Sequence, residues 1–176
     1  MDHVAAVRRA NPHTPASWAR ESNIHLTVKF LGEIRKSSVE QISLAAGKSS
    51  AGFASFSIEI GGTGAFPKRG VPKVLWIGVR DLSGQLSELH KQLELECARL
   101  GFPQEERLFH PHLTVARLRR PQGSRALAAT HQGLAFAPLV FEVSELLVIR
   151  SELKTEGSRY TVLSRHSLAA PAARNN

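Results

Sequence analysis

The four residues His-Leu-Thr-Val occur twice in the chain, at positions 25–28 and again at 112–115. Both copies lie in apolar segments that favour β-structure, residues 24–31 and 111–118. Successive side chains of a strand point to opposite faces, so each copy presents its histidine and threonine on one face and its leucine and valine to a core. Two such strands facing each other bring together two imidazoles, which exchange protons, and two hydroxyls, which donate hydrogen bonds. That set suits acid–base chemistry on a phosphoryl group.

His25 and His112 are the candidate catalytic acid and base, and Thr27 and Thr114 are the candidate hydrogen-bond donors to phosphate oxygens. Imidazole has an unperturbed pKa of about 6.5, so both of its protonation states are populated near neutral pH. A single histidine in a strand is usually a core residue, but an identical repeat containing histidine is improbable by chance in 176 residues. The symmetry of the two copies leaves open which histidine is the acid.

A metal site is the first alternative, because His110 and His112 have a spacing that supplies two ligands from one strand face. Zinc would still need a third ligand. Threonine stands at the paired position of both motifs, and Pro111 disturbs the strand at His110. We therefore expect no metal and no other cofactor. The other histidines have no repeated context and are expected at the surface: His3, His13, His90, His131 and His166.

The repeat extends to the order of secondary structure, because the two motifs are 87 residues apart, close to half of the 176 residues. The first half is expected to form a helix over 38–48 and strands over 53–60 and 73–80, and the second a helix over 124–132 and strands over 139–146 and 160–165. Residues 37–40 form a capping-box pattern before the first helix. A longer helix over 82–100, ended by Gly101, carries an apolar stripe that should pack in the core: Leu82, Leu86, Leu89, Leu93, Cys97 and Leu100.

These halves predict a single bilobal α+β domain over residues 1–176, with lobes at about 18–80 and 82–167 and a disordered tail at 168–176. Each lobe would have an antiparallel sheet with helices outside, and the active-site groove would lie between the lobes, with one motif from each. The 87-residue offset, applied backwards, places a strand and half a helix before Met1 and leaves only a helical stub at 4–9. We therefore expect the N-terminal strand to be missing and a sheet edge to be unpaired.

Composition restricts the class of protein, since 42% of the residues are apolar and the net charge is +8 with a pI near 10.4. The charge favours a polyanionic partner such as nucleic acid, although cations scattered over a solvated surface would give the same total. Cys97 is the only cysteine, which fits a reducing cytoplasm. No apolar run approaches the roughly 18 residues needed to cross a bilayer. We expect a cytoplasmic monomer that does not bind membranes.

The glycine- and proline-rich segment 61–72 reads as a loop that carries Phe66, Lys68 and Arg69. It lacks the spacing of a phosphate-binding Walker loop. It is either an ordinary hairpin connection or a basic lip with an aromatic ring on which a base stacks. Strict alternation points Arg117 away from the catalytic face, so it reaches phosphate only if its strand ends or twists there. Sequence does not rank the remaining cations, which are Arg107, Arg119, Arg120 and Arg150.

Six segments of the chain, in order, resemble the two-histidine (2H) phosphoesterases: 23–33, 64–67, 74–79, 109–117, 150–153 and 158–163. Within that superfamily the chain is most similar to the RNA 2′,3′-cyclic phosphodiesterases of the 2′-5′ RNA ligase type. The likeness covers about residues 18–167, and the family departs from this sequence at its N-terminus, where it has a strand and a full helix. The resemblance implies that His25 is the proton donor, that His112 is the proton acceptor, and that Thr27 and Thr114 assist them. The candidate substrate contacts come from the loop and the strand described above, not from the resemblance, and are Phe66, Arg69 and Arg117.

The resemblance implies hydrolysis of RNA 2′,3′-cyclic phosphate ends to 2′-phosphomonoesters, with weak reverse ligation that forms a 2′-5′ linkage. Two alternatives stay open. One is a phosphodiesterase that acts on a small cyclic nucleotide such as an ADP-ribose cyclic phosphate. The other is a non-catalytic RNA- or nucleotide-binding module, against which the presence of both histidines and both threonines argues, because binding alone could use lysine or arginine.

Overall fold

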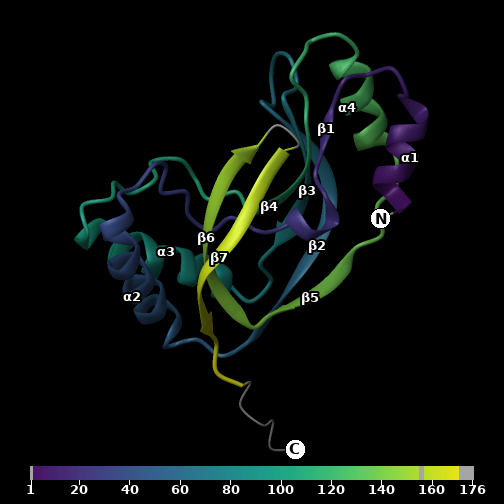
Figure 1. Cartoon of the computed structure of the whole chain (residues 1–176). Helices are drawn as coiled ribbons and strands as arrows, with labels where there is room; N and C mark the ends of the chain where they lie inside the picture. The colour runs from purple at the N-terminus through teal and green to yellow at the C-terminus, as the bar shows by residue number, and fades with distance from the viewer. Residues whose placement is uncertain (1, 155–156, 171–176) are drawn as a thin grey trace, which may run out of the picture. The chain divides into compact units, whose positions relative to one another are not determined.

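The computed structural model describes residues 2–154 and 157–170 (Figure 1). The chain divides into two compact units, each assembled from three segments. Unit 1 comprises Met1–Thr27, Glu59–Arg80 and Pro111–Leu139, and unit 2 comprises Val28–Ile58, Asp81–His110 and Val140–Asn176. Each unit takes segments from both sequence halves, so the units are not the halves 18–80 and 82–167 themselves. That the chain works as one bilobal domain stays a prediction.

The protein has the α+β class predicted from its sequence. Its helices are α1 (Asp2–Ala10), α2 (Val39–Ser50), α3 (Gln85–Arg99) and α4 (Ser124–Gly133), with short 3-10 turns η1 (Glu21–Asn23) and η2 (Lys36–Ser38). Its strands are β1 (Ser17–Trp18), β2 (Phe56–Phe66), β3 (Val74–Arg80), β4 (His112–Arg117), β5 (Leu139–Val143), β6 (Glu145–Lys154) and β7 (Gly157–Ser167). One sheet has the order β1-β4-β3-β2-β5, and β6 and β7 form a separate antiparallel pair. Within the described ranges no helix is long and apolar enough to cross a membrane.

The sheet of unit 1 has one buried and one half-exposed face. Along β3 the side chains of Leu75, Ile77 and Val79 are buried, whereas the alternate residues are only half-buried. Helices α1 and α4 lie side by side in this unit (Figure 1). The guanidinium of Arg8 on α1 lies 5.7 Å from the ring centroid of Trp18. Trp18 belongs to β1 and is the register partner of the buried Ala116 on β4. The half-buried residues of β3 leave that face of the sheet accessible to a candidate site.

Unit 2 is built on helices α2 and α3, which pack together, and on the β6–β7 hairpin, which packs against α2. The leucine stripe of α3 is buried as predicted at its central positions, which are Leu86, Leu89, Leu93 and Cys97. Leu82 lies before the helix and is 73% exposed, and Leu100 lies after it and is 37% exposed, so the predicted places of both in the core are wrong. Gly101, with a φ of 85°, ends the helix as predicted. Burial raises the pKa of the Cys97 thiol, which fits an inert packing residue.

Two local predictions are wrong. The capping box at 37–40 does not form, because η2 precedes α2 and Ser38 already has helical backbone angles without a side-chain cap. The predicted loop at 61–72 is shorter, because β2 continues to Phe66. A register shift between Ile60 and Thr63 absorbs the two glycines there, one of which, Gly62, has a φ of 70°. Glycine adopts that conformation without strain, so the strand continues past its bulge.

The end of the chain is ordered further than predicted. Strand β5 stops at Val143, and β6 begins at Glu145 and pairs with β7, a hairpin that the sequence did not separate from the segment 139–146. The Leu168 N–H donates to the Ser144 carbonyl at 2.8 Å, and its side chain is buried. The N–H of Ala169 donates to the Phe53 carbonyl at 2.9 Å. The disordered tail therefore cannot begin at 168, and positions 171–176 lie outside the described residues.

His131 is fully buried on α4, so its predicted surface location is wrong. Its Nε2–H donates to the Trp76 carbonyl at 3.0 Å, and its Nδ1 lies 3.0 Å from Nε2 of His3, whose Nδ1 lies 3.3 Å from the Ala135 carbonyl. Helical spacing explains the burial, because His131 lies one turn beyond the buried Leu127. Desolvation by burial lowers the pKa of His131; the hydrogen bond to Trp76 raises it and the charge of His3 lowers it further.

Acid should destabilise the fold through His131. The folded state keeps this imidazole neutral below the usual pKa of 6.5, so the unfolded state binds more protons there. The stability of the wild type relative to His131→Gln, which keeps a donor for the Trp76 carbonyl, should therefore fall as the pH drops below about 6.5, by at most about 1.4 kcal/mol per pH unit. Urea unfolding across this range measures it. His3→Gln should keep the sign of the slope, and parallel curves for wild type and His131→Gln would contradict the prediction.

Candidate active site

The two copies of the repeated motif have different local structure. The second begins β4 at His112, as predicted, but the first is not a strand. Its one β-bridge joins Leu26 to Leu113 in antiparallel orientation, and the predicted strand at 24–31 is therefore wrong. The physical reason is the chain path: η1 ends at Asn23, and the chain passes into unit 2 after Thr27, so only a short stretch can pair.

The bridge between Leu26 and Leu113 sets the two motifs in a crossed register. In an antiparallel pair, the neighbours of bridged residues oppose each other, which puts His25 opposite Thr114 and Thr27 opposite His112. Directly opposed Cβ atoms lie about 4.5–5.5 Å apart and diagonal neighbours about 7–8 Å. Both histidines belong to unit 1. Because these units are not the predicted lobes, the placement of one motif in each lobe stays a prediction. One short antiparallel contact is enough to assemble all four candidate side chains.

A bulge in β4 brings Arg117 onto the same face as His112. Trp76 pairs with Thr114, but Leu75 pairs with Ala116, so Val115 is an extra residue in the register. Both Val115 and Ala116 are buried, which breaks the alternation. Beyond the bulge Arg117 pairs with Val74, whose face of β3 is the half-buried one. Strict alternation would point Arg117 away from the catalytic face, and the bulge is the local change that reverses its direction.

Hydrogen bonding fixes the orientation of the His25 imidazole. Its Nδ1 lies 2.8 Å from the carbonyl oxygen of Asn23, and a carbonyl only accepts, so Nδ1 carries a proton. In the neutral ring Nε2 is then the basic nitrogen, and in the charged ring Nε2 carries the proton available for transfer. The side chain is half-buried, and Thr27 beside it is exposed. This geometry lets His25 exchange its proton through one defined atom.

Aromatic side chains surround His112. The ring of Phe66 meets the imidazole edge-on at 5.2 Å between centroids, and the ring of Trp76 lies 6.3 Å away. Gly64 makes this arrangement possible, because a Cβ there would lie 2.1 Å from Cζ2 of Trp76. On β3, Gly78 is the register partner of His112 and adds no side chain beside it. The predicted contact residue Phe66 therefore does lie at the candidate base.

The remaining predicted cations are spread over the chain. Arg69 is exposed in the connection between β2 and β3. Arg107 and Arg150 belong to unit 2. Nη2 of Arg150 lies 3.5 Å from Oε2 of Glu152, with which it forms an ion pair. In the described part of the chain, no group of three or more histidine, cysteine, aspartate or glutamate side chains could hold a metal ion.

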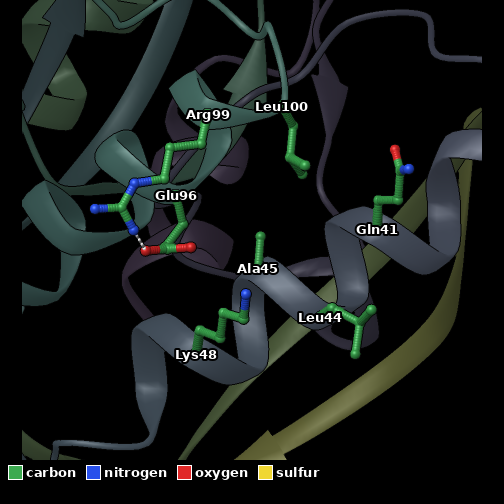
Figure 2. A pocket seen from close by; sticks show the side chains of 7 residues that line it. All are labelled: Gln41, Leu44, Ala45, Lys48, Glu96, Arg99 and Leu100. Atoms are coloured by element: carbon green, nitrogen blue, oxygen red, sulfur yellow. Dashed lines mark hydrogen bonds and ion pairs between the residues drawn. The ribbon is translucent and has the colours of Figure 1, made fainter.

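A pocket of about 200 Å³ lies on unit 2 between α2 and α3, and none of its lining residues is a predicted site residue (Figure 2). It is lined by Gln41, Leu44, Ala45, Lys48, Glu96, Arg99 and Leu100. Figure 2 shows Arg99 turned towards Glu96 of its own helix, with which it forms an ion pair. The pocket contains no histidine and no hydroxyl side chain, so it does not offer the acid–base chemistry of the motif pair.

Glu94 on α3 holds two segments that lead to the motifs. Its Oε2 accepts hydrogen bonds from Lys29 Nζ at 2.7 Å and from the N–H of Glu105 at 3.1 Å. Lys29 Nζ also donates to the Pro103 carbonyl at 3.0 Å. Lys29 follows Thr27 by two positions, and Glu105 belongs to the loop that precedes the second motif. One carboxylate in unit 2 thus anchors the chain after the first motif and before the second.

Breaking this ion pair should be costly, because the Lys29 and Glu94 side chains are only 6% and 9% exposed. Glu94→Gln leaves a buried ammonium without its counter-ion and should lower the free energy of unfolding by about 3–5 kcal/mol. Replacing both partners, Lys29→Met with Glu94→Leu, should recover most of that loss because no charge is left buried. Chemical denaturation of the three proteins measures it, and equal losses in the single and double variants would exclude the ion pair as the cause.

Comparison with known proteins identifies the family. The model of the 2′-5′ RNA ligase superfamily matches residues 2–155, which include both motifs. The chain belongs to this superfamily. An RNA 2′,3′-cyclic phosphodiesterase from Aeropyrum pernix is 31% identical over 166 residues, 93% of each protein. Among solved structures, TT0787 of Thermus thermophilus has a TM-score of 0.77 and is 26% identical, with 96% of this chain and 91% of that chain covered. E. coli LigT complexed with 3′-AMP has a TM-score of 0.68 and is 25% identical, with 95% of this chain and 91% of that chain covered.

Membership of the 2′-5′ RNA ligase superfamily confirms the resemblance found in the sequence. The structural matches extend over nearly the whole chain, so the shared fold takes in both units. The superfamily match also covers Phe66 and the bulged strand that carries Arg117, neither of which belongs to the repeated motif.

Proposed function

We propose that this member of the superfamily hydrolyses RNA 2′,3′-cyclic phosphate ends to 2′-phosphomonoesters. The observation that carries the proposal is the crossed register at Leu26 and Leu113, in which each histidine faces the threonine of the other motif. Two imidazoles on a diagonal of about 7–8 Å leave room for a phosphorus atom between them. The Aeropyrum pernix relative, an RNA 2′,3′-cyclic phosphodiesterase by name, supports the same reaction.

In the proposed mechanism His112 removes a proton from water, the water oxygen bonds to phosphorus, and the bond from phosphorus to O3′ breaks. His25, protonated on both ring nitrogens, delivers its Nε2 proton to the departing O3′ while Nδ1 stays bonded to Asn23. Thr27 and Thr114 donate hydrogen bonds to the non-bridging oxygens, where charge develops. The products are a free 3′-hydroxyl and a 2′-phosphomonoester. A 5′-hydroxyl that attacks the same phosphorus in place of water, with the same loss of O3′, would form a 2′-5′ linkage.

Turnover of an oligonucleotide that ends in a 2′,3′-cyclic phosphate tests this function. The reaction is run in EDTA because the proposed steps use only side chains of this chain, and ³¹P NMR reports the position of the phosphate in the product. A 2′-phosphate is the expected product. A 3′-phosphate product would mean that O2′ rather than O3′ is the leaving group. Turnover of an ADP-ribose cyclic phosphate without turnover of RNA would identify the alternative substrate class. We further propose that the protein is a cytoplasmic monomer. Size-exclusion chromatography tests whether it is monomeric.

A further inference from the structure

His131 is a fully buried titratable side chain that the proposed mechanism does not use. It lies on α4 in unit 1, the unit that also contains both motif histidines. Its Nε2–H donates to the Trp76 carbonyl at 3.0 Å, so the imidazole holds the main chain of β3 directly. The neighbouring buried positions of α4 are filled by Leu127 and Ala128, and a further apolar side chain would fill this one without desolvating a polar ring.

Trp76 is the residue at which β3 meets the candidate site. It is the register partner of Thr114 on β4 and of Gly64 on β2. Its ring lies 6.3 Å from the imidazole of His112 and 5.3 Å from the ring of Phe66, measured between centroids. The main-chain position of Trp76 therefore sets both the strand opposite the Thr114 hydroxyl and the aromatic wall beside His112.

The hydrogen bond from His131 reaches β3 where the sheet is irregular. The register between β3 and β4 shifts between Leu75 and Trp76, at the bulge that contains Val115. A bulge leaves one residue out of the ladder and bends the strand locally. A side chain that donates to the main chain at this point restrains the sheet where its own ladder is disrupted.

His3 on α1 fixes the tautomer that His131 needs for this bond. The Trp76 carbonyl only accepts, so Nε2 of His131 carries a proton. Desolvation by burial lowers the pKa of His131, so the ring is neutral near neutral pH and its Nδ1 only accepts. Nε2 of His3 lies 3.0 Å from that Nδ1 and therefore donates to it. The rings of the two histidines meet edge-on at 5.0 Å between centroids.

We propose that His131, held by His3, is a positioning residue for the proposed reaction and acts on His112 through Trp76. The inference rests on the proposed function and adds a residue that touches neither the substrate nor the reacting atoms. The contacts run from α1 to α4, from α4 to the main chain of β3, and from the Trp76 ring to His112. A displacement of about 1 Å far from the chemistry costs up to about 10²-fold in rate. Loss of the bond should therefore slow the chemical step without weakening substrate binding.

Kinetics of three variants test the positioning role. His131→Leu removes the donor and keeps a large apolar side chain. His131→Gln keeps an amide N–H for the Trp76 carbonyl and an amide oxygen that accepts from His3. Leu127→Val is the matched control, because Leu127 is fully buried one turn earlier on the same helix.

The expected result is a separation of kcat from KM, measured with a 2′,3′-cyclic phosphate oligonucleotide at a temperature where all the proteins are folded. His131→Leu should lower kcat by roughly 10–10²-fold and leave KM within about twofold of the wild type. His131→Gln should recover most of the lost kcat. The control Leu127→Val should have the kcat and KM of the wild type.

The NMR signal of the His112 ring gives a second readout that needs no turnover. It is assigned by its absence from the spectrum of His112→Ala, and the ring currents of Trp76 and Phe66 displace it from the position typical of an exposed histidine. His131→Leu should move the signal, whereas His131→Gln and Leu127→Val should leave it in place. In the wild type, ¹⁵N shifts should show a neutral His131 ring with its proton on Nε2.

An unmoved His112 signal in His131→Leu would overturn the proposal, as would an unchanged kcat in an active enzyme, an equal effect of Leu127→Val, or no recovery in His131→Gln. If His131→Leu does not fold, the wild-type tautomer and His3→Ala decide. A proton on Nδ1 of His131, or a His112 signal in His3→Ala identical to that of the wild type, would exclude the chain of contacts. If the wild type hydrolyses no cyclic phosphate, the proposed function fails, while the His112 signal still decides the positioning.

Discussion

Replacing either histidine of the motif pair with alanine should lower turnover of a 2′,3′-cyclic phosphate substrate by about 10²–10⁴-fold, the usual contribution of a positioned acid or base. Each variant keeps the register at Leu26 and Leu113, so the substrate should still bind. The double variant should be only slightly slower than the slower single variant, because the two groups act in the same step. Steady-state kinetics at saturating substrate measure all three proteins.

The pH profile separates the two roles. His112→Ala removes the group that must start unprotonated, so the acidic limb of the kcat/KM profile should disappear. His25→Ala removes the group that must start protonated, so the basic limb should disappear. His13, which is exposed in unit 1, provides the matched control, and His13→Ala should behave as the wild type. Retention of more than about a third of wild-type turnover in either single variant would exclude paired-histidine catalysis.

The elements that followed a simple periodicity were predictable from sequence. Alternation predicted β3, where every second residue is buried, and the leucine spacing predicted α3 with its stop at Gly101. His131 was placed wrongly although a signal existed, because it extends the helical spacing of Leu127 on α4. A polar side chain outside any repeated motif favours the surface, and the helical spacing outweighs that preference at His131.

The candidate site was predictable in its residues but not in its geometry. The repeat identified His25 and His112, but strand alternation is a local rule, and a bulge reverses it for every residue that follows. The signal available in the sequence was the pair of adjacent apolar residues Val115 and Ala116, both of which are buried in the structure. The first motif does not form a strand because the chain leaves unit 1 directly after it. The position of that exit is set by contacts between residues far apart in the sequence. Lys29, a charge in an apolar segment, marked that point because its partner Glu94 lies on a distant helix.

Replacing the motif threonines with valine should slow the chemical step by roughly 10–10³-fold for each residue, mainly in kcat, because hydroxyl donors to the developing phosphate charge act most strongly in the transition state. Valine keeps the β-branched shape, so packing changes little. In the crossed register Thr27 faces His112 and Thr114 faces His25, so losing either hydroxyl affects the phosphate beside one histidine. Kinetics with a 2′,3′-cyclic phosphate oligonucleotide measure the loss.

A structural role for the threonines predicts a different pattern. A threonine that only packs would give unchanged kcat and reduced stability in the valine variant, and serine, which keeps the hydroxyl but loses the methyl group, would not restore it. A threonine that donates to phosphate would give the reverse, with Thr27→Ser and Thr114→Ser recovering most of the lost turnover. Thr27 separates the two roles more cleanly, because its side chain is exposed and contributes little to packing. Loss of folding rather than of kcat in Thr27→Val would remove the hydroxyls from the proposed mechanism and leave the charge on phosphate to other donors.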